Sequence, residues 1–303
     1  MTVHMEKHNA MKKSGYMSGA AGRGRGMALA AGMLLAVMQM YAQPKVVGHR
    51  GCRFNTPDDP GTLLYENTLP ALGFAQELGV DAVEFDVQLT SDGKVIVFHG
   101  PEVPVTGKDI RKITFAQARG TVLPGGHRMP EIEEYLRQGK KTPQMKLICE
   151  IKKQSSRERE TMAVEQVMAA VRKLGMENQV EYTSFSEWIC KEVHRIRPES
   201  KVLFLDSGVF VKTPEYAAEQ GYDGISYDFN GFMNHPDYVA RARKLGIETT
   251  LWIVNSYEVV EWAVRHGVDC ISSDHPEKVQ AYVEAISSRN SVKAVGSRPN
   301  ELP

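Results

Sequence analysis

Two acidic residues stand two positions apart in an otherwise apolar stretch in the first third of the chain. Glu84 and Asp86 alternate with Val83, Phe85 and Val87. If this stretch is a β-strand, the acids point to one face and the apolar side chains to the other. Neighbouring carboxylates repel each other and resist burial unless a cation lies between them. The pattern therefore indicates a site for a hard metal ion.

A histidine follows the next predicted strand. After a turn at 91–93, residues 95–98 form a short apolar strand that leads into His99. Histidine exchanges protons near neutral pH, so a metal ion and a proton donor or acceptor would be neighbours. Taken alone, Glu84 and Asp86 could equally well be ordinary surface acids on the polar face of a strand, with His99 in a surface loop.

Polar and charged residues also stand at the ends of several other predicted strands. They are His49 and Arg50, Glu150 and Lys152, Trp252 and Asn255, and Ser273 and Asp274. In a barrel of parallel strands, the carboxyl ends meet at one face, and active sites lie there. Ordinary surface acids would not all occupy strand ends, so the coincidence favours an active site over the surface alternative.

The order of predicted elements indicates the fold. Strands and amphipathic helices alternate over residues 46–286 and give eight βα units. This count predicts an α/β protein, a (β/α)8 TIM barrel, with an insertion at 100–144 between the second and third units. A doubly wound open sheet is the alternative, but the glycine-rich phosphate loop that often follows the first strand of such folds is missing.

Capping residues indicate where the helices begin and end. A helix is expected at 69–78, with Thr68 or Asn67 as N-cap and Gly79 as C-cap. Further helices are expected at 157–174, 187–196, 214–220, 236–245, 257–266 and 276–286. Beyond them we expect a polar tail, assigned to 291–303 and frayed from Ser287 onward.

The first 42 residues are typical of a secretory signal peptide. Their net charge is +4, and the basic segment precedes an apolar run at 27–38 and a possible cleavage site after Ala42. The run is shorter than the roughly 20 residues that a membrane span needs. We expect export to the periplasm or the exterior, a mature domain at 43–290 and no stable membrane insertion after cleavage. An uncleaved anchor is the alternative.

Composition limits the other possibilities. The 303-residue chain is 42% hydrophobic and 24% charged, as expected for a globular protein. Its net charge is zero, which leaves −4 on the mature part, so a nucleic-acid partner is not expected. The four cysteines show no metal-binding or CxxC spacing, and we expect them to be free thiols.

Several motifs, taken together and in this order, resemble those of the glycerophosphodiester phosphodiesterase family of (β/α)8 barrels. The resemblance covers about residues 46–285. The motifs are Gly48-His49-Arg50-Gly51, Glu66-Asn67-Thr68, Glu84-Phe85-Asp86-Val87, His99, Glu150-Ile151-Lys152, Ser184-Phe185, Trp252-Ile253-Val254-Asn255 and Ser273-Asp274.

The resemblance implies metal-dependent hydrolysis. Glu84, Asp86 and Glu150 would hold one divalent cation, and an all-oxygen set of ligands suits Mg²⁺ or Ca²⁺. His49 and His99 would act as general acid and base. The products would be an alcohol and a glycerol phosphate.

The resemblance also implies contacts to a small-molecule glycerophosphodiester substrate. Arg50 and Lys152 would contact the phosphate, and Glu66 would lie near the metal ion or the glycerol. Phe185 and Trp252 would form a wall of the pocket, although each is equally well explained as an aromatic residue of the barrel core.

One departure from the family pattern leaves alternatives open. Gly100 stands where the family commonly has Asp after the second histidine, and the change could alter the pKa of His99 or the accepted substrate. A barrel that binds phosphodiesters without hydrolysing them is one alternative. A phosphodiesterase acting on phospholipids or wall polymers is another. The loop at 52–65 and the insertion show no apolar or basic stripe for membrane docking, which favours a soluble substrate.

Overall fold

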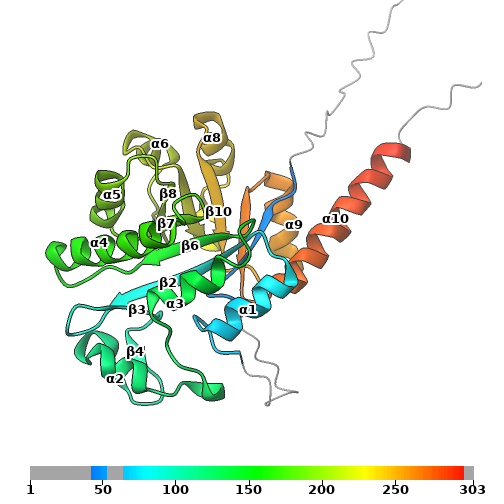
Figure 1. The fold of residues 1–303 in the computed structure, drawn as a ribbon. Helices are drawn as coiled ribbons and strands as arrows, with labels where there is room; N and C mark the ends of the chain where they lie inside the picture. The colour runs from blue at the N-terminus through cyan, green and yellow to red at the C-terminus, as the bar shows by residue number, and fades with distance from the viewer. Residues whose placement is uncertain (1–41, 53–63, 297–303) are drawn as a thin grey trace, which may run out of the picture. The chain divides into compact units, whose positions relative to one another are not determined.

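Parallel strands form a closed barrel in the computed structural model, which describes residues 42–52 and 64–296 (Figure 1). The eight barrel strands of this part of the chain are β1 (Lys45–Gly48), β2 (Ala82–Leu89), β6 (Lys146–Ile151), β7 (Val180–Ser184), β8 (Val202–Asp206), β9 (Gly224–Asp228), β10 (Glu248–Trp252) and β11 (Cys270–Ser273). Strand β1 pairs with both β11 and β2, which closes the sheet. The predicted barrel is confirmed, and the open sheet is excluded. The predicted signal peptide lies outside the described residues, apart from Ala42.

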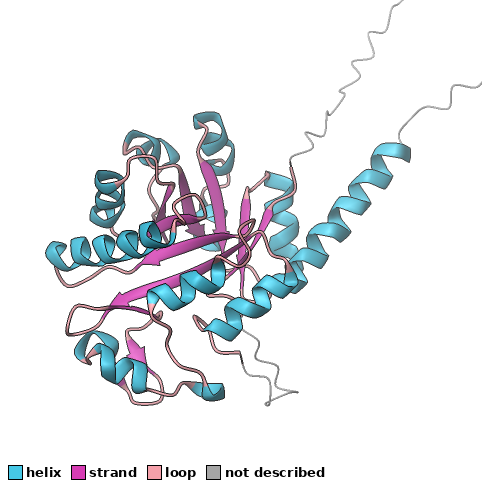
Figure 2. Ribbon diagram, in the orientation of Figure 1, coloured by secondary structure: helices cyan, strands magenta, loops and turns pink. Residues whose placement is uncertain are grey.

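Helices cover the outside of the barrel (Figure 2). They are α1 (Leu69–Leu78), α3 (Ile132–Gly139), α4 (Arg157–Leu174), α5 (Glu187–Ile196), α6 (Pro214–Glu219), α7 (Phe229–Asn234), α8 (Tyr238–Leu245), α9 (Tyr257–His266) and α10 (Pro276–Gly296). Helix α1 has the predicted ends: the side chain of Thr68 accepts a hydrogen bond from the N–H of Ala71, and Gly79 has φ of 65°. Glycine readily adopts this left-handed backbone conformation, which ends the helix.

The segment between β2 and β6, residues 90–145, includes the predicted insertion at 100–144. It contains β3 (Val95–Val97), β4 (Glu102–Val103), β5 (Lys108–Asp109), α2 (Phe115–Gly120) and the 3-10 turns Ile110–Lys112 and Pro124–Gly126. Its apolar side chains form a small core of their own, which includes Ile96, Phe98, Ile110 and Met129. Helix α3, the last element of this segment, packs against α1 and α4. It therefore takes the place of the second barrel helix. Strand β3 pairs antiparallel with β2, which brings His99 to the barrel mouth.

Helices α7, α8 and α10 differ from the predictions, and α8 does so in starting at Tyr238 and not at Pro236. Helix α7 was not predicted, and it starts directly after β9 because the side chain of Asp228 caps the N–H of Gly231 at 3.0 Å. Helix α10 continues to Gly296, so the prediction that the chain frays from Ser287 is wrong for residues 287–296. No glycine or proline interrupts the chain between Ser287 and Gly296, so the sequence contains no earlier stop signal.

The predicted outer face of β2 packs between the sheet and the helices. Phe85 is fully buried, and its ring stacks on Tyr135 of α3 with centroids 4.6 Å apart.

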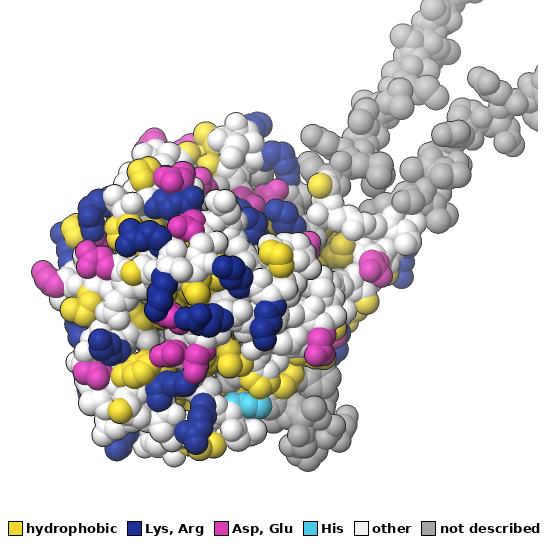
Figure 3. Space-filling model, in the orientation of Figure 1, with side chains coloured by type: hydrophobic (Ala, Val, Ile, Leu, Met, Phe, Trp, Pro, Cys, Tyr) yellow, Lys and Arg dark blue, Asp and Glu magenta, His cyan; other side chains and the backbone are white. Residues whose placement is uncertain are grey.

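All four cysteines are buried free thiols, as predicted. Within the described residues, no helix is both long and apolar enough to cross a membrane. Figure 3 shows basic and acidic side chains interspersed on one face of the molecule.

Candidate active site

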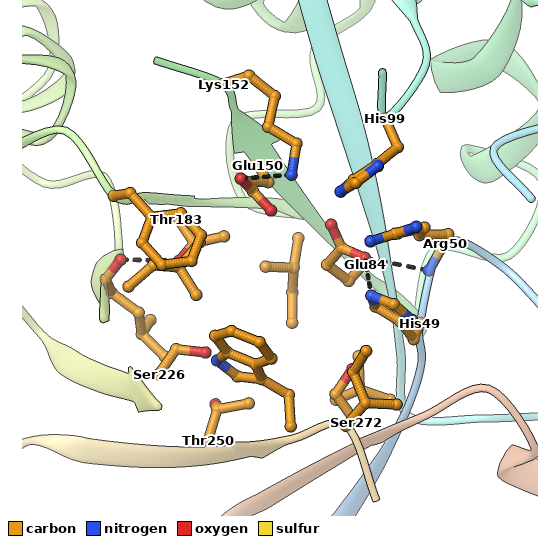
Figure 4. Close-up of a pocket in the computed structure, with 17 residues that line it drawn as sticks. His49, Arg50, Glu84, His99, Glu150, Lys152, Thr183, Ser226, Thr250 and Ser272 are labelled. Atoms are coloured by element: carbon orange, nitrogen blue, oxygen red, sulfur yellow. Dashed lines mark hydrogen bonds and ion pairs between the residues drawn. The ribbon is translucent and has the colours of Figure 1, made fainter. Parts of the chain in front are cut away.

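A pocket of about 180 Å³ opens at the carboxyl ends of the barrel strands. It brings together the predicted residues His49, Arg50, Glu84, His99, Glu150, Lys152, Phe185 and Trp252 (Figure 4). In the close-up, the charged residues lie along one side, and the neutral Thr183, Ser226, Thr250 and Ser272 lie along the other.

Three carboxylates converge at this pocket. Glu84 and Asp86 come from β2, and Glu150 is the register partner of Asp86 on β6. One oxygen atom from each lies within 4.8 Å of the others. Their side chains expose only 12%, 1% and 10% of their surface, respectively. The alternation in β2 predicted that Glu84 and Asp86 share one face.

Two cationic side chains and one amide contact the carboxylate of Asp86. Lys152 Nζ lies 2.8 Å from Oδ1, Arg50 Nε lies 3.4 Å from Oδ2, and Asn67 Nδ2 donates to Oδ2 at 2.7 Å. Burial alone would raise the pKa of Asp86, but Lys152 and Arg50 hold that pKa well below its usual value. Asp86 is therefore ionised at neutral pH. Asn67 was not predicted to be a site residue.

Nearby cations neutralise the carboxylates of Glu84 and Glu150 less completely than that of Asp86. Glu84 Oε2 accepts the backbone N–H of Arg50 at 3.0 Å, but Oε1 has no hydrogen-bond partner among the described residues. Burial, together with Asp86 and Glu150, raises the pKa of Glu84 well above its usual value. Burial and Asp86 likewise raise the pKa of Glu150 to about 7, although Lys152 Nζ is 2.6 Å away. This excess of buried negative charge fits a divalent cation held by the three carboxylates.

His49 is oriented by a chain of hydrogen bonds. Its Nδ1 lies 2.8 Å from Asp274 Oδ1, and Asn255 Nδ2 donates to Asp274 Oδ2 at 3.1 Å. Because the carboxylate accepts the Nδ1 proton, Nε2 is left facing Glu84 Oε2 at 4.0 Å. The sequence placed Asp274 and Asn255 at strand ends but gave them no role. The bond between Asp274 and His49 depends on closure of the barrel between β11 and β1.

His99 lies at the rim, just beyond β3. Its carbonyl oxygen accepts a hydrogen bond from Gln88 Nε2 at 2.7 Å. Burial lowers the pKa of His99 to about 4, although Asp86 acts in the opposite direction. The next residue, Gly100, has φ of 63°, and a Cβ there would lie 3.1 Å from both Gln88 Nε2 and Ile110 Cγ2. Glycine therefore fits this left-handed, crowded turn.

Glu66 contacts Arg50 and is not one of the three clustered acids. Arg50 Nη1 donates to Glu66 Oε1 and Oε2 at 2.9 and 3.1 Å. These bonds and the contact with Asp86 fix the guanidinium in the pocket wall and raise the pKa of Arg50 in spite of burial. Arg50 is therefore held as a permanent cation beside the carboxylates.

Aromatic and hydroxyl groups form the opposite wall. The rings of Phe185 and Trp252 meet edge to face with centroids 6.0 Å apart. Trp252 Nε1 and Thr250 Oγ1 have no hydrogen-bond partner within the described chain. Since both residues line the pocket, these groups are available to a polar part of a ligand.

Comparisons with known proteins agree with this geometry. Residues 49–278 match the model of the glycerophosphoryl diester phosphodiesterase family. A glycerophosphodiester phosphodiesterase of Caldanaerobacter subterraneus subsp. tengcongensis is 28% identical over 77% of this chain and 94% of its own length. The crystal structure of a glycerophosphodiester phosphodiesterase from Parabacteroides distasonis is 30% identical and has a TM-score of 0.75, covering 82% of this chain and 99% of that one.

A more distant structure shares the fold. A phosphodiesterase of Oleispira antarctica, solved in complex with its product sn-glycerol-3-phosphate, has a TM-score of 0.70 at 20% identity, covering 80% of this chain and 97% of that one. The family match extends over most of the barrel and includes both histidines and the three clustered carboxylates. The chain therefore belongs to the glycerophosphoryl diester phosphodiesterase family.

Proposed function

We propose that the chain hydrolyses glycerophosphodiesters to an alcohol and a glycerol phosphate in a metal-dependent reaction. The main support is one pocket that combines three clustered carboxylates with two histidines and two cationic side chains. A phosphodiester is an anion that gains charge in the transition state, so a hydrolase needs cationic groups beside the phosphate, here Arg50, Lys152 and the divalent cation that the carboxylates would hold.

The phosphate-binding side of the pocket consists of Arg50 and Lys152. Arg50 is held in place by Glu66, and Lys152 by Asp86 and Glu150. Both cations are positioned before substrate arrives, so they can stabilise developing negative charge without a large reorganisation. A divalent cation held by Glu84, Asp86 and Glu150 would supply Lewis-acid stabilisation of the same charge.

The two histidines would transfer the protons. One accepts a proton from the nucleophile, a water molecule or the adjacent glycerol hydroxyl, as its oxygen bonds to phosphorus. If the hydroxyl attacks, a cyclic phosphate forms, and water then opens it to glycerol phosphate with the two histidines exchanging roles. The other donates a proton to the leaving alkoxide as the P–O bond breaks. His49 is held by Asp274 with Nε2 toward Glu84, and burial favours the neutral form of His99. Neutral His99 is suited to accept the first proton.

A panel of glycerophosphodiesters with different head groups, each assayed with Mg²⁺, Ca²⁺ and EDTA, tests the proposal. We expect turnover that depends on the metal ion and releases glycerol phosphate. Binding without any turnover would instead favour the non-catalytic barrel, for which Gly100 is the supporting feature. Turnover only of phospholipids or wall polymers would favour the other enzyme class.

Asp274→Asn should lower kcat by about 10- to 100-fold, the usual effect of losing a group that orients a functional histidine. An amide can donate to Nδ1 and so favour the wrong tautomer of His49. KM should change little, because Asp274 does not line the pocket. Asp269→Asn is the matched control. The carboxylate of Asp269, just before β11, accepts hydrogen bonds from the backbone N–H and the hydroxyl of Thr249 in β10. This variant should leave kcat unchanged. An unaltered kcat in Asp274→Asn would disprove the positioning role.

We also propose that the protein is exported and that its mature form begins near Gln43. The support is the basic and apolar pattern of residues 1–42. Intact-mass measurement of the protein from the extracytoplasmic fraction should show loss of this segment. Recovery of a membrane-bound form that retains residues 27–42 would favour an anchor instead.

A further inference from the structure

The main chain of His99 is held by a side chain of β2. Strand β3 ends at Val97, and the N–H of Phe98 still donates to the carbonyl oxygen of Asp86 at 3.0 Å. At the next residue, Gln88 Nε2 donates to the carbonyl oxygen of His99 at 2.7 Å. This bond fixes the peptide unit that follows the Cα of His99, just where the chain turns away from the sheet.

Gln88 stands on the strand that carries two of the clustered carboxylates. Residues 84, 86 and 88 alternate along β2 and so share one face. Gln88 is only 5% exposed and does not line the pocket. Because a strand is a rigid support, the bond sets the position of His99 relative to Glu84 and Asp86. Gln88 can therefore influence a bound ligand through His99 without touching it.

The other half of the Gln88 amide has no partner. Its Oε1 is buried and makes no hydrogen bond within the described residues. Burial of an amide acceptor without a partner costs stability, and an apolar side chain of similar length would avoid that cost. Stability alone therefore does not account for a glutamine at this position. Departures of this kind are expected where a residue serves a functional site.

Gly100 leaves the space that the amide needs. A Cβ on residue 100 would lie 3.1 Å from Gln88 Nε2, which is tighter than an ordinary van der Waals contact. The φ of 63° at this residue also favours glycine. The glycine and the glutamine thus fit together at the turn that carries His99.

We propose that Gln88 is a positioning residue for proton transfer, and that its amide holds His99 where the imidazole can reach the substrate. This inference rests on the proposed function, in which His99 transfers a proton. His49 is held in another way, through Nδ1 of its ring, by Asp274 at 2.8 Å. The two histidines are therefore positioned by unlike contacts, one with a carboxylate at the ring and one with an amide at the main chain.

Gln88→Met tests this role, because methionine is close to glutamine in length but has no hydrogen-bond donor. We expect kcat for glycerophosphocholine to fall by about 10- to 100-fold, since misplacing a reacting group by about 1 Å can cost about 10²-fold. KM should change by less than about threefold, because Arg50 and Lys152 keep their contacts. Tm should stay near the wild-type value, because the lost bond and the removal of the unpartnered Oε1 act in opposite directions.

A double-mutant cycle with His99→Ala shows whether the effect is transmitted through His99. In the His99→Ala background, Gln88→Met should change kcat by less than about twofold, because the group that Gln88 positions is gone. A loss of kcat as large as in the wild-type background would overturn the proposal and leave Gln88 as a structural residue.

Gln166→Met is the matched control. Gln166 Nε2 donates to the carbonyl oxygen of Gly93 at 2.8 Å, in the turn between β2 and β3 and away from the pocket. The control therefore removes the same kind of bond from the same hairpin, and it should leave kcat unchanged. If it lowers kcat as much as Gln88→Met does, the effect belongs to loosening of the hairpin and the proposal is wrong.

The imidazole signal of His99 provides a readout that does not need turnover. In NMR spectra of protein with isotope-labelled histidine, the signal is assigned by its loss in His99→Ala. We expect it to shift in Gln88→Met and to stay in place in Gln166→Met. A wild type that hydrolyses no glycerophosphodiester would overturn the proposed function, and this shift would then still support the positioning of His99 by Gln88. An unmoved signal in that case would overturn the positioning role as well.

Discussion

Glu84→Gln should lower kcat/KM by about 10²- to 10³-fold with the barrel still folded. Gln keeps the size of the side chain but removes one of three negative charges that would hold the divalent cation. Wild-type protein treated exhaustively with EDTA should lose activity and regain it when Mg²⁺ or Ca²⁺ is added. Initial-rate assays with a glycerophosphodiester measure both effects.

The same substitution should leave the metal-free protein at least as stable as the wild type. Burial and the neighbouring acids raise the pKa of Glu84 in the fold, so its ionised form costs stability as the pH rises through that value. Gln has no charge to bury, and Tm at neutral pH in EDTA should be equal or higher. Glu181→Gln is the control, because this acid pairs with Lys201 at 3.1 Å outside the pocket and should not affect kcat/KM. An unchanged rate in Glu84→Gln, or full turnover after chelation, would sink the metal assignment.

His99→Ala should lower kcat by about 10²- to 10⁴-fold, the usual contribution of a general acid or base. Substrate affinity, measured by calorimetry, should change much less, since Arg50 and Lys152 remain in place. His194→Ala removes a histidine that pairs with Asp223 away from the pocket, and it should keep wild-type kcat.

Gly100→Asp tests whether the missing family carboxylate matters. If the wild type is active, the variant should shift the pH profile toward higher pH, because a carboxylate beside an imidazole raises its pKa. It should also be less stable, since φ of 63° and the 3.1 Å contacts disfavour a side chain. An inert wild type that Gly100→Asp restores to turnover would show that the native protein is a binder and that His99 no longer acts in catalysis.

The regular parts of the fold could be predicted because local signals coincide there. Helices α1, α4, α5 and α9 begin and end at the predicted residues, where a cap residue meets the end of an apolar repeat. Helix α7 escaped prediction because Asp228 both ends a strand and caps a helix, which leaves no loop between them. Helix α8 starts at Tyr238 and not at the predicted Pro236.

The site could be predicted as a set of residues but not as a network. Alternation in β2 placed Glu84 and Asp86 on the face that lines the barrel, and the strand order brought Glu150 beside them. The bond that fixes His49 joins segments far apart in sequence: Asp274 lies 225 residues from His49. Such pairings depend on barrel closure and register, which single-strand patterns do not encode.

The two sides of the pocket come from different stretches of the chain. Residues 45–152 supply the acids, the cations and both histidines, whereas residues 183–272 supply most of the apolar and hydroxyl wall. A chimera joined near residue 154 with another member of the family would therefore exchange the ligand-selecting wall while retaining the hydrolytic groups. The bond between His49 and Asp274 is the one contact of the catalytic set described above that such a chimera must re-form across the junction.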